Sequence, residues 1–269
     1  MGEVMLYFVA TPIGNLKDIS YRAIETLGFV DEIACEDTRH SIVLLSHYGI
    51  KKPLFSYHKY NEREESERII EKLKAGKNIA VITDAGMPVV SDPGNILCER
   101  LIEEGLEYTI IPGANAGLSA LVLSGLSAEK FTFIGFLPEK KTRREELLAE
   151  YVGRKETLIF YSAPHDIKKD CETVYAALGD RVAVAVKEIT KVHERAIRFN
   201  LKDGFPEEPK GEFVLIVEGA KEKADVNGLS EEEHIRYYLD KGFDKKEAIK
   251  KAAKDRGVSK SALYKYTIE

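Results

Sequence analysis

Three loops rich in glycine, proline and alanine are the segments of this sequence best suited to bind a ligand. Each follows a short apolar run, and they occupy residues 11–16, 83–94 and 111–120. Glycine lets a backbone come close to a ligand, and proline stiffens the loop. Open α/β sheets bind ligands at the carboxyl ends of their strands, so we expect the three loops to meet at one site.

The loop at residues 83–94, TDAGMPVVSDPG, is the most informative of the three, because it holds two acidic residues, two prolines and two glycines. In a shorter loop, Asp84 and Asp92 could simply cap backbone amides. A run of this length favours a binding loop. The chain contains neither GxGxxG nor GxxxxGK[ST], which disfavours nicotinamide oxidoreductases and P-loop nucleotidases.

Apolar runs of strand length recur along the chain, separated by stretches with helical spacing. One helix should start at Asn61, with Glu64 as its capping-box partner, and end at Gly76, while Thr142 and Glu145 should cap another. Strands that alternate with helices predict a mostly parallel, layered sheet. The expected strands lie at residues 5–10, 32–36, 78–83, 108–112, 131–136, 157–162, 181–187 and 212–219.

These elements predict an α/β protein with two domains, residues 1–118 and 119–224, and a ligand cleft between them. Residues 225–269 should form a small helical appendage, with capping boxes at Ser230–Glu233 and Asp244–Glu247 and a helix stop at Gly257. Its apolar positions suffice for a small core packed on a neighbour: Ile235, Leu239, Ala248, Ile249, Ala252, Leu263 and Tyr266.

The net charge is −5, from 40 basic and 45 acidic residues, which argues against a protein that coats nucleic acid by bulk attraction. Its distribution is uneven, because residues 140–144 read KKTRR and residues 241–265 are strongly basic. The three cysteines lie far apart without a CxxC pair, which excludes the usual zinc spacings and a disulfide framework. With a first apolar run too short for a membrane span, we expect a cytoplasmic protein without a metal site.

Six segments carry longer motifs: TPIGNLKDIS (11–20), ACEDTRHS (34–41), SYHKYNE (56–62), VITDAGMPVVSDPG (81–94), IPGANAGLSAL (111–121) and FTFIGFLP (131–138). In this order they closely resemble the ribosomal RNA small-subunit methyltransferase I family. That family belongs to the tetrapyrrole-methylase superfamily of S-adenosylmethionine enzymes. The resemblance covers nearly the whole chain and includes the helical tail.

The resemblance implies a two-domain methyltransferase, typically a homodimer, with S-adenosylmethionine in the interdomain cleft. The reaction would methylate the ribose 2′-hydroxyl of a cytidine in small-subunit (16S) ribosomal RNA, either as naked RNA or in an assembled subunit. A positively charged sulfonium suits loops that lack Lys and Arg. By analogy, ten residues would bind the cofactor, the last two at its adenosyl end: Pro12, Ile13, Gly14, Asp84, Gly86, Met87, Asn115, Ala116, Tyr161 and Ser162.

A ribose hydroxyl is a poor nucleophile while it is protonated, so the reaction needs a group that accepts its proton. The candidates are Glu36, Asp37 and His58, which follow two of the expected strands, with Arg39 and Lys59 beside them as phosphate contacts. The alternative is structural. Asp37 would then cap the helix that begins near residue 38 and pair with Arg39.

Further RNA contacts are expected from Lys140, Lys141, Arg143 and Arg144, since cations at a helix start oppose its dipole and would gain from a phosphate partner. A solvated helix start is the alternative. The basic tail could contact RNA like a helix-turn-helix or could pack in a dimer. Two other functions stay open: a tetrapyrrole or corrinoid C-methyltransferase, and a non-catalytic RNA-binding assembly protein.

Overall fold

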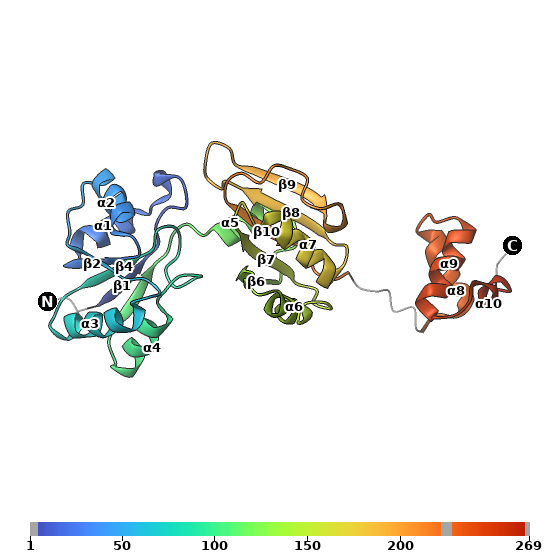
Figure 1. Ribbon diagram of the computed structural model, residues 1–269, viewed down its shortest axis with the longest axis horizontal. Helices are drawn as coiled ribbons and strands as arrows, with labels where there is room; N and C mark the ends of the chain where they lie inside the picture. The colour runs from blue at the N-terminus through green and yellow to red at the C-terminus, as the bar shows by residue number, and fades with distance from the viewer. Residues whose placement is uncertain (1–4, 222–227, 267–269) are drawn as a thin grey trace. The chain divides into compact units, whose positions relative to one another are not determined.

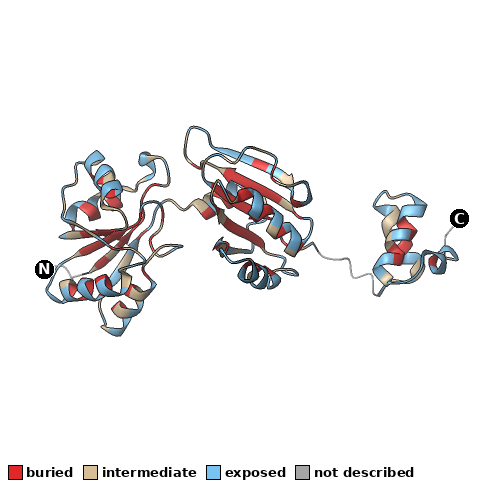
Figure 2. Ribbon diagram, viewed as in Figure 1, coloured by how far each residue is buried: buried red, intermediate tan, exposed pale blue. Residues whose placement is uncertain are grey.

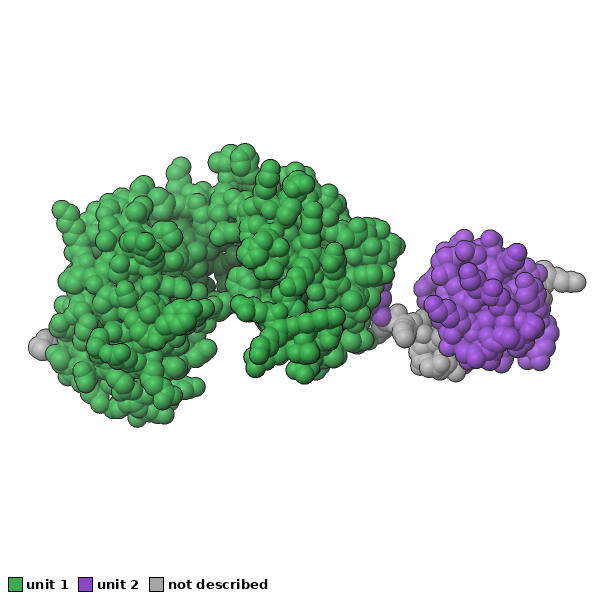
Figure 3. All heavy atoms as spheres, in the orientation of Figure 1, with its two compact units in different colours: residues 1–220 green, residues 221–269 purple. Residues whose placement is uncertain are grey.

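The computed structural model describes residues 5–221 and 228–266. The chain forms two compact units, residues 1–220 and 221–269 (Figure 3). Within these described residues, the first unit contains two five-stranded sheets and the second contains three helices (Figure 1). We call the part around the first sheet, residues 5–111, the first lobe, and the part around the second sheet, residues 116–217, the second lobe.

The first lobe is a parallel sheet in the order β3-β2-β4-β1-β5. Its central strands read as continuous apolar runs because helices cover both faces, which the buried strands in Figure 2 illustrate. This sheet confirms the predicted parallel, layered arrangement. Its strands are β1 (Leu6–Val9), β2 (Glu32–Cys35), β3 (Leu54–Ser56), β4 (Ile79–Ile82) and β5 (Tyr108–Ile111), and its helices are η1 (Leu16–Asp18), α1 (Tyr21–Phe29), α2 (Thr38–His47), α3 (Glu62–Lys74) and α4 (Asn95–Glu103).

The second lobe has a mixed sheet in the order β6-β7-β10-β8-β9. β6 and β7 pair in parallel, and the other neighbouring strands pair antiparallel. β8 and β9 are joined by residues 188–194, which contain no helix, and a direct connection of this kind favours antiparallel pairing. Its elements are α5 (Ala116–Ser124), β6 (Phe131–Phe136), α6 (Lys141–Ala149), β7 (Thr157–Ser162), α7 (Ile167–Leu178), β8 (Val182–Lys187), β9 (Arg195–Asn200), η2 (Leu201–Asp203) and β10 (Phe213–Val217).

Alternation along β10 shows how this sheet forms two cores. Phe213, Leu215 and Val217 pack with side chains of α6 and α7, while Val214 and Ile216 pack with α5. Successive side chains of a strand point to opposite faces, so one apolar strand serves both cores.

Two of the predicted helix caps are wrong. Asn61 precedes α3 but makes no cap hydrogen bond; its side chain accepts from the His58 amide and donates to the Ser56 carbonyl. Thr142 lies inside α6, which follows Lys140 without a side-chain cap. A capping pattern in the sequence does not fix the first residue of the helix, which is why Thr142 lies inside α6. Nor does it show which other backbone groups the side chain will bond, as Asn61 does.

The second unit contains α8 (Glu231–Asp240), α9 (Lys245–Arg256) and α10 (Lys260–Tyr264). Ser230 and Glu233 form the predicted capping box, the Asp244 side chain accepts from the Glu247 amide, and α9 ends at Gly257 with φ +64°. All seven predicted apolar positions pack together in this unit and form its small core, while the packing of that core on a neighbour stays a prediction. In the ranges described above, no helix is long and apolar enough to cross a membrane.

Candidate functional site

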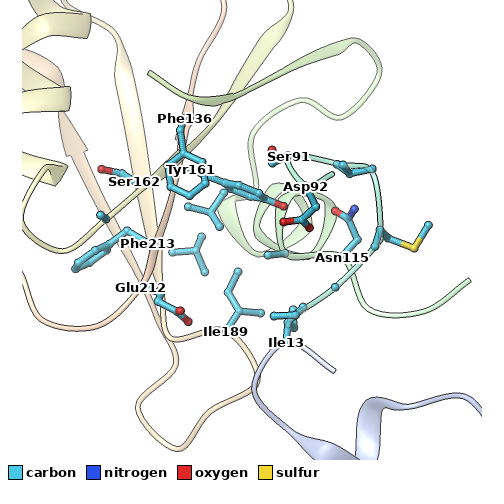
Figure 4. A pocket seen from close by; sticks show the side chains of 18 of the residues that line it. Ile13, Ser91, Asp92, Asn115, Phe136, Tyr161, Ser162, Ile189, Glu212 and Phe213 are labelled. Carbon is cyan, nitrogen blue, oxygen red and sulfur yellow. The ribbon is translucent and has the colours of Figure 1, made fainter. Parts of the chain in front are cut away.

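A pocket of about 360 Å³ lies in the first unit, and residues from both lobes line it (Figure 4). Each of the three glycine-bearing loops contributes lining residues from the first side. The second lobe contributes the ends of β6, β7 and β8, the residues that follow β7 and β8, and the start of β10. The lining residues are Ile13, Ala85, Gly86, Met87, Val90, Ser91, Asp92, Asn115, Ala116, Phe136, Tyr161, Ser162, Ala163, Pro164, Val186, Ile189, Glu212, Phe213 and Val214.

The first two loops are joined by their backbones. The amides of Thr11 and Gly86 each donate to the other residue's carbonyl, at 2.9 and 3.1 Å, and the Thr11 hydroxyl donates to the Thr83 carbonyl at 3.1 Å. Gly86 has φ +88°, and a Cβ there would come within 3.3 Å of Ile13 Cγ2. The pairing therefore needs glycine at this position.

The second loop holds backbone strain beside the pocket. Val89 and Ser91 have φ of 73° and 68°, a region that L-residues other than glycine seldom occupy, least of all a β-branched one. The loop is fixed downstream by the Glu62 carboxylate, which accepts from the Gly94 amide at 2.7 Å and the Ile96 amide at 3.3 Å. Such strain persists only where the surrounding structure enforces it, and it clusters at functional sites.

Aromatic rings form the wall of the second lobe. Tyr161 lies edge to face with Phe133 and Phe136, at ring distances of 5.0 and 5.5 Å. Burial raises the pKa of the Tyr161 phenol, so this hydroxyl stays protonated at neutral pH. Next to it, Ser162 donates from its hydroxyl to Asp170 at 2.6 Å.

Seven of the ten predicted cofactor residues line this one pocket: Ile13, Gly86, Met87, Asn115, Ala116, Tyr161 and Ser162. Pro12, Gly14 and Asp84 are not among the lining residues. Gly14 packs under the loop after β8, since a Cβ there would lie 2.8 Å from Lys191 Cγ. The Asp84 carboxylate accepts from the Asp37 amide at 3.3 Å and lies 3.3 Å from His40 Nδ1.

Asp37 takes the structural role that the sequence left open. Its carboxylate caps α2 by accepting from the Arg39 amide at 2.8 Å and pairs with the Arg39 guanidinium at 2.6 Å. Hydrogen bonds from Arg39 lower the pKa of Asp37 to about 2. A carboxylate with so low a pKa is a weak proton acceptor.

Glu36 and His58, the other two candidate proton acceptors, lie outside the set of pocket-lining residues. Burial, followed by the charge of Asp84, raises the pKa of Glu36. His58 has a buried Nδ1 with no hydrogen-bond partner among the described residues.

Asp92 belongs to a loop that the sequence predicts to bind a ligand, but it was not among the predicted site residues. It lines the pocket, and among the described residues it has no hydrogen-bond partner. Burial, then the charges of Glu36 and Asp84, raises the pKa of Asp92 to about 6. The lining residues of the second lobe, such as Ile189 and Glu212, carried no motif that could have identified them.

Arg144 is wrong as a predicted RNA contact. Its side chain is only 5% exposed and is paired with Asp170, with 2.8 Å between Nη1 and Oδ1, and it also donates to the Pro138 carbonyl. Arg144 and Leu148 lie one turn apart on the buried face of α6, which the sequence run KKTRR concealed.

The other predicted phosphate contacts are on the surface. Lys140, Lys141 and Arg143 are exposed at the start of α6. Lys59 is exposed and lies over the Tyr60 ring at 5.0 Å from its centroid, while the Arg39 side chain is 88% exposed although paired. These five cations remain available to a polyanion.

The lining of the pocket indicates what it can hold. Its residues include two carboxylates and no Lys or Arg, together with small and aromatic side chains. A ligand with a positive charge and a flat apolar part matches this surface, and the volume lies in the usual range for small-molecule sites.

Comparison with known proteins gives a consistent relationship. The family model of the tetrapyrrole (corrin/porphyrin) methylases matches residues 5–203. Proteins named ribosomal RNA small subunit methyltransferase I are similar over nearly their full length: that of Halalkalibacterium halodurans is 46% identical (96% of this chain, 93% of the relative), and that of Bacillus subtilis is 44% identical (97% and 92%).

Solved structures share the fold at low sequence identity. A diphthine synthase matches with a TM-score of 0.63 at 18% identity, over 80% of this chain and 90% of that one. Uroporphyrin-III-C-methyltransferase from Thermus thermophilus matches with a TM-score of 0.59 at 18% identity, over 80% and 94%. These similarities establish a two-domain α/β arrangement common to all three.

Proposed function

The chain belongs to the tetrapyrrole (corrin/porphyrin) methylase family, within the group of ribosomal RNA small subunit methyltransferase I, and from this we propose its reaction. It transfers the methyl group of S-adenosylmethionine to the 2′-hydroxyl of a cytidine ribose in 16S ribosomal RNA, in the cytoplasm. The observation that carries the proposal is the near-full-length identity of 46% and 44% to relatives with that name.

The pocket fits S-adenosylmethionine. When bound, this cofactor supplies a methyl group on a positively charged sulfur. We propose that Ile13, Gly86, Met87, Asn115 and Ala116 hold it from the first side, with Tyr161 and Ser162 at the adenosyl end. In this proposal Pro12, Gly14 and Asp84 do not line the pocket and instead support the loops that carry these residues.

Several features of the site favour methyl transfer. The absence of Lys and Arg from the lining spares the sulfonium any repulsion, and the apolar walls keep water away from the transferred group. Alignment of the attacking oxygen with the methyl carbon accounts for much of the rate in such displacements. Glu36, Asp37 and His58 form the polar set through which a ribose hydroxyl would approach.

The test is transfer of labelled methyl from S-adenosylmethionine. We expect label in the RNA of small ribosomal subunits, at a position that resists alkaline cleavage because the 2′-oxygen is blocked. Assays with naked 16S RNA run in parallel identify the preferred substrate. Label in a corrinoid or other tetrapyrrole, and none in RNA, would replace the proposal with C-methylation. Failure to bind S-adenosylmethionine in calorimetry would point to a non-catalytic RNA-binding protein.

RNA binding is expected to depend on the cations at the start of α6. Affinity for RNA falls as salt concentration rises, and the slope of log affinity against log salt measures the number of phosphate contacts. Replacing Lys140, Lys141 and Arg143 with Gln should make this slope shallower by about 2, for three lost contacts to single-stranded RNA. The measurement is a salt titration of binding to small-subunit RNA. Arg144 stays unchanged, since its side chain is buried.

A matched variant with the same change in charge provides the control. Lys246, Lys250 and Lys254 are exposed on α9 and can be replaced with Gln together. Loss of slope in this variant alone would move the RNA contact to the second unit. An unchanged slope in both variants would leave the α6 cations as solvated surface.

We also propose a homodimer, as is typical of the family. β5 and β6 are outer strands of their sheets and expose apolar side chains, among them Ile110 at 41% and Phe136 at 60%. On α5, which lies between them in sequence, Val122 is 77% exposed. A second copy would cover such side chains, and sedimentation velocity would give the mass of the assembly.

A further inference from the structure

One carboxylate in the pocket has no partner. Two carboxylates line the pocket, and that of Glu212 is paired with Lys191, with 2.7 Å between Oε2 and Nζ. Asp92 accepts no hydrogen bond from any other residue that the structure describes. Figure 4 shows its carboxylate directed into the pocket, on the side where the Tyr161 hydroxyl and Asn115 also point. A partly buried carboxylate without a partner is costly, so a role toward a bound molecule is the natural explanation.

The backbone holds Asp92 in place on both sides. Val89 and Ser91, which precede Asp92, have positive φ angles. Pro93, which follows it, restricts the backbone conformation of Asp92. Ser91 Oγ packs against β6, since a Cβ at Gly135 would lie 3.2 Å from it, and Glu62 fixes the Gly94 amide. The position of this carboxylate is therefore set before any ligand binds, which is what a catalytic group needs.

We propose that Asp92 is the catalytic residue that accepts the proton of the substrate hydroxyl, an assignment that rests on the proposed methyl transfer. The substrate oxygen forms its bond to the methyl carbon while the carbon–sulfur bond breaks. The electron pair of that bond stays on sulfur, which becomes a neutral thioether. The hydroxyl proton passes to a carboxylate oxygen of Asp92 and then to water, which restores the residue.

The electrostatic surroundings suit this role. Burial and the negative charges of Glu36 and Asp84 raise the pKa of Asp92 to about 6. Tyr161, the titratable group facing it from β7, stays neutral because its own pKa is raised. At neutral pH Asp92 is mostly ionised, yet it is a much better proton acceptor than Asp37, whose pKa is about 2. Glu36 would then act on Asp92 through its charge.

The experiment compares Asp92→Asn with Glu36→Gln and His58→Gln. We expect Asp92→Asn to lower the single-turnover rate of methyl transfer by about 10²–10³-fold. Its affinities for S-adenosylmethionine and S-adenosylhomocysteine, measured by calorimetry, should stay close to those of the wild type. In the wild type the rate should fall below about pH 6, and this acid limb should be missing in Asp92→Asn. Removing the charge of Glu36 should move the limb to lower pH.

Each other outcome overturns the assignment. Retention of the rate and the acid limb in Asp92→Asn would exclude Asp92, and loss of the limb in Glu36→Gln or His58→Gln would give the role to that residue. A selective loss of affinity for S-adenosylmethionine over S-adenosylhomocysteine would mean that Asp92 attracts the positive sulfur.

A readout that needs no activity separates this proposal from the proposed function. In ¹³C-carboxyl NMR of the protein labelled at aspartate, a resonance titrating near pH 6 should disappear in Asp92→Asn. Its presence in a wild type that methylates no RNA would overturn the proposed function only. Absence of such a resonance would overturn the assignment of Asp92 itself.

Discussion

Replacing Arg144 with methionine is expected to lower the free energy of unfolding by about 3–5 kcal/mol. The substitution removes one partner of a buried ion pair and leaves the Asp170 carboxylate in the interior. Arg144 and Asp170 are each only 5% exposed, and Asp170 also accepts a hydrogen bond from Ser162. Desolvation already raises the pKa of Asp170, so its charge depends on the guanidinium beside it.

Urea unfolding followed by near-ultraviolet circular dichroism of the tyrosines would measure this loss. Arg143→Met is the matched control, since the neighbouring side chain is exposed and its replacement should change the free energy of unfolding by about 0.5 kcal/mol or less. The double variant with Asp170→Asn should lose less than the sum of the single variants. Equal effects of Arg143→Met and Arg144→Met would contradict a buried, paired Arg144.

Replacing Gly86 with alanine is expected to weaken cofactor binding on the order of 10- to 100-fold, because small displacements at a site of precise alignment have effects of this size. At φ +88° an alanine costs about 1–2 kcal/mol in backbone strain. Its Cβ would also press on Ile13 Cγ2 at 3.3 Å. Relief of the backbone strain and of the contact with Ile13 would shift the hydrogen-bonded pair of Thr11 and Gly86, and with it the part of the pocket lining that Gly86 forms.

Gly76→Ala is the control for backbone strain. Gly76 has the same φ of +88°, but nothing lies within 4 Å of a Cβ placed there. We expect the two variants to lose similar stability and only Gly86→Ala to lose affinity for S-adenosylhomocysteine in calorimetry. Unchanged affinity in Gly86→Ala would remove this glycine from the binding site.

The local features of this protein could be predicted from its sequence. The strands of the parallel sheet follow from continuous apolar runs, and the core of the second unit follows from the spacing of residues such as Ile249 and Leu263. The three loops around the pocket were identifiable because Gly, Pro and Asp are concentrated in a few short segments. In each case the physical cause acts between residues that are close in the sequence, so the local pattern of residue types is enough to predict the feature.

Other features were decided only when distant segments came together. In KKTRR, four cations look alike, but only Arg144 faces α7 and meets Asp170, 26 residues further along the chain. Asp92 differs from Asp84 only through its surroundings, which leave one carboxylate bonded to the Asp37 amide and direct the other into the pocket. The antiparallel pairing of β10 with β7 and β8 is likewise set by packing. The sequence by itself determined which residues could do chemistry, while burial and charge–charge contacts, which exist only in the folded chain, decided which of them face the pocket.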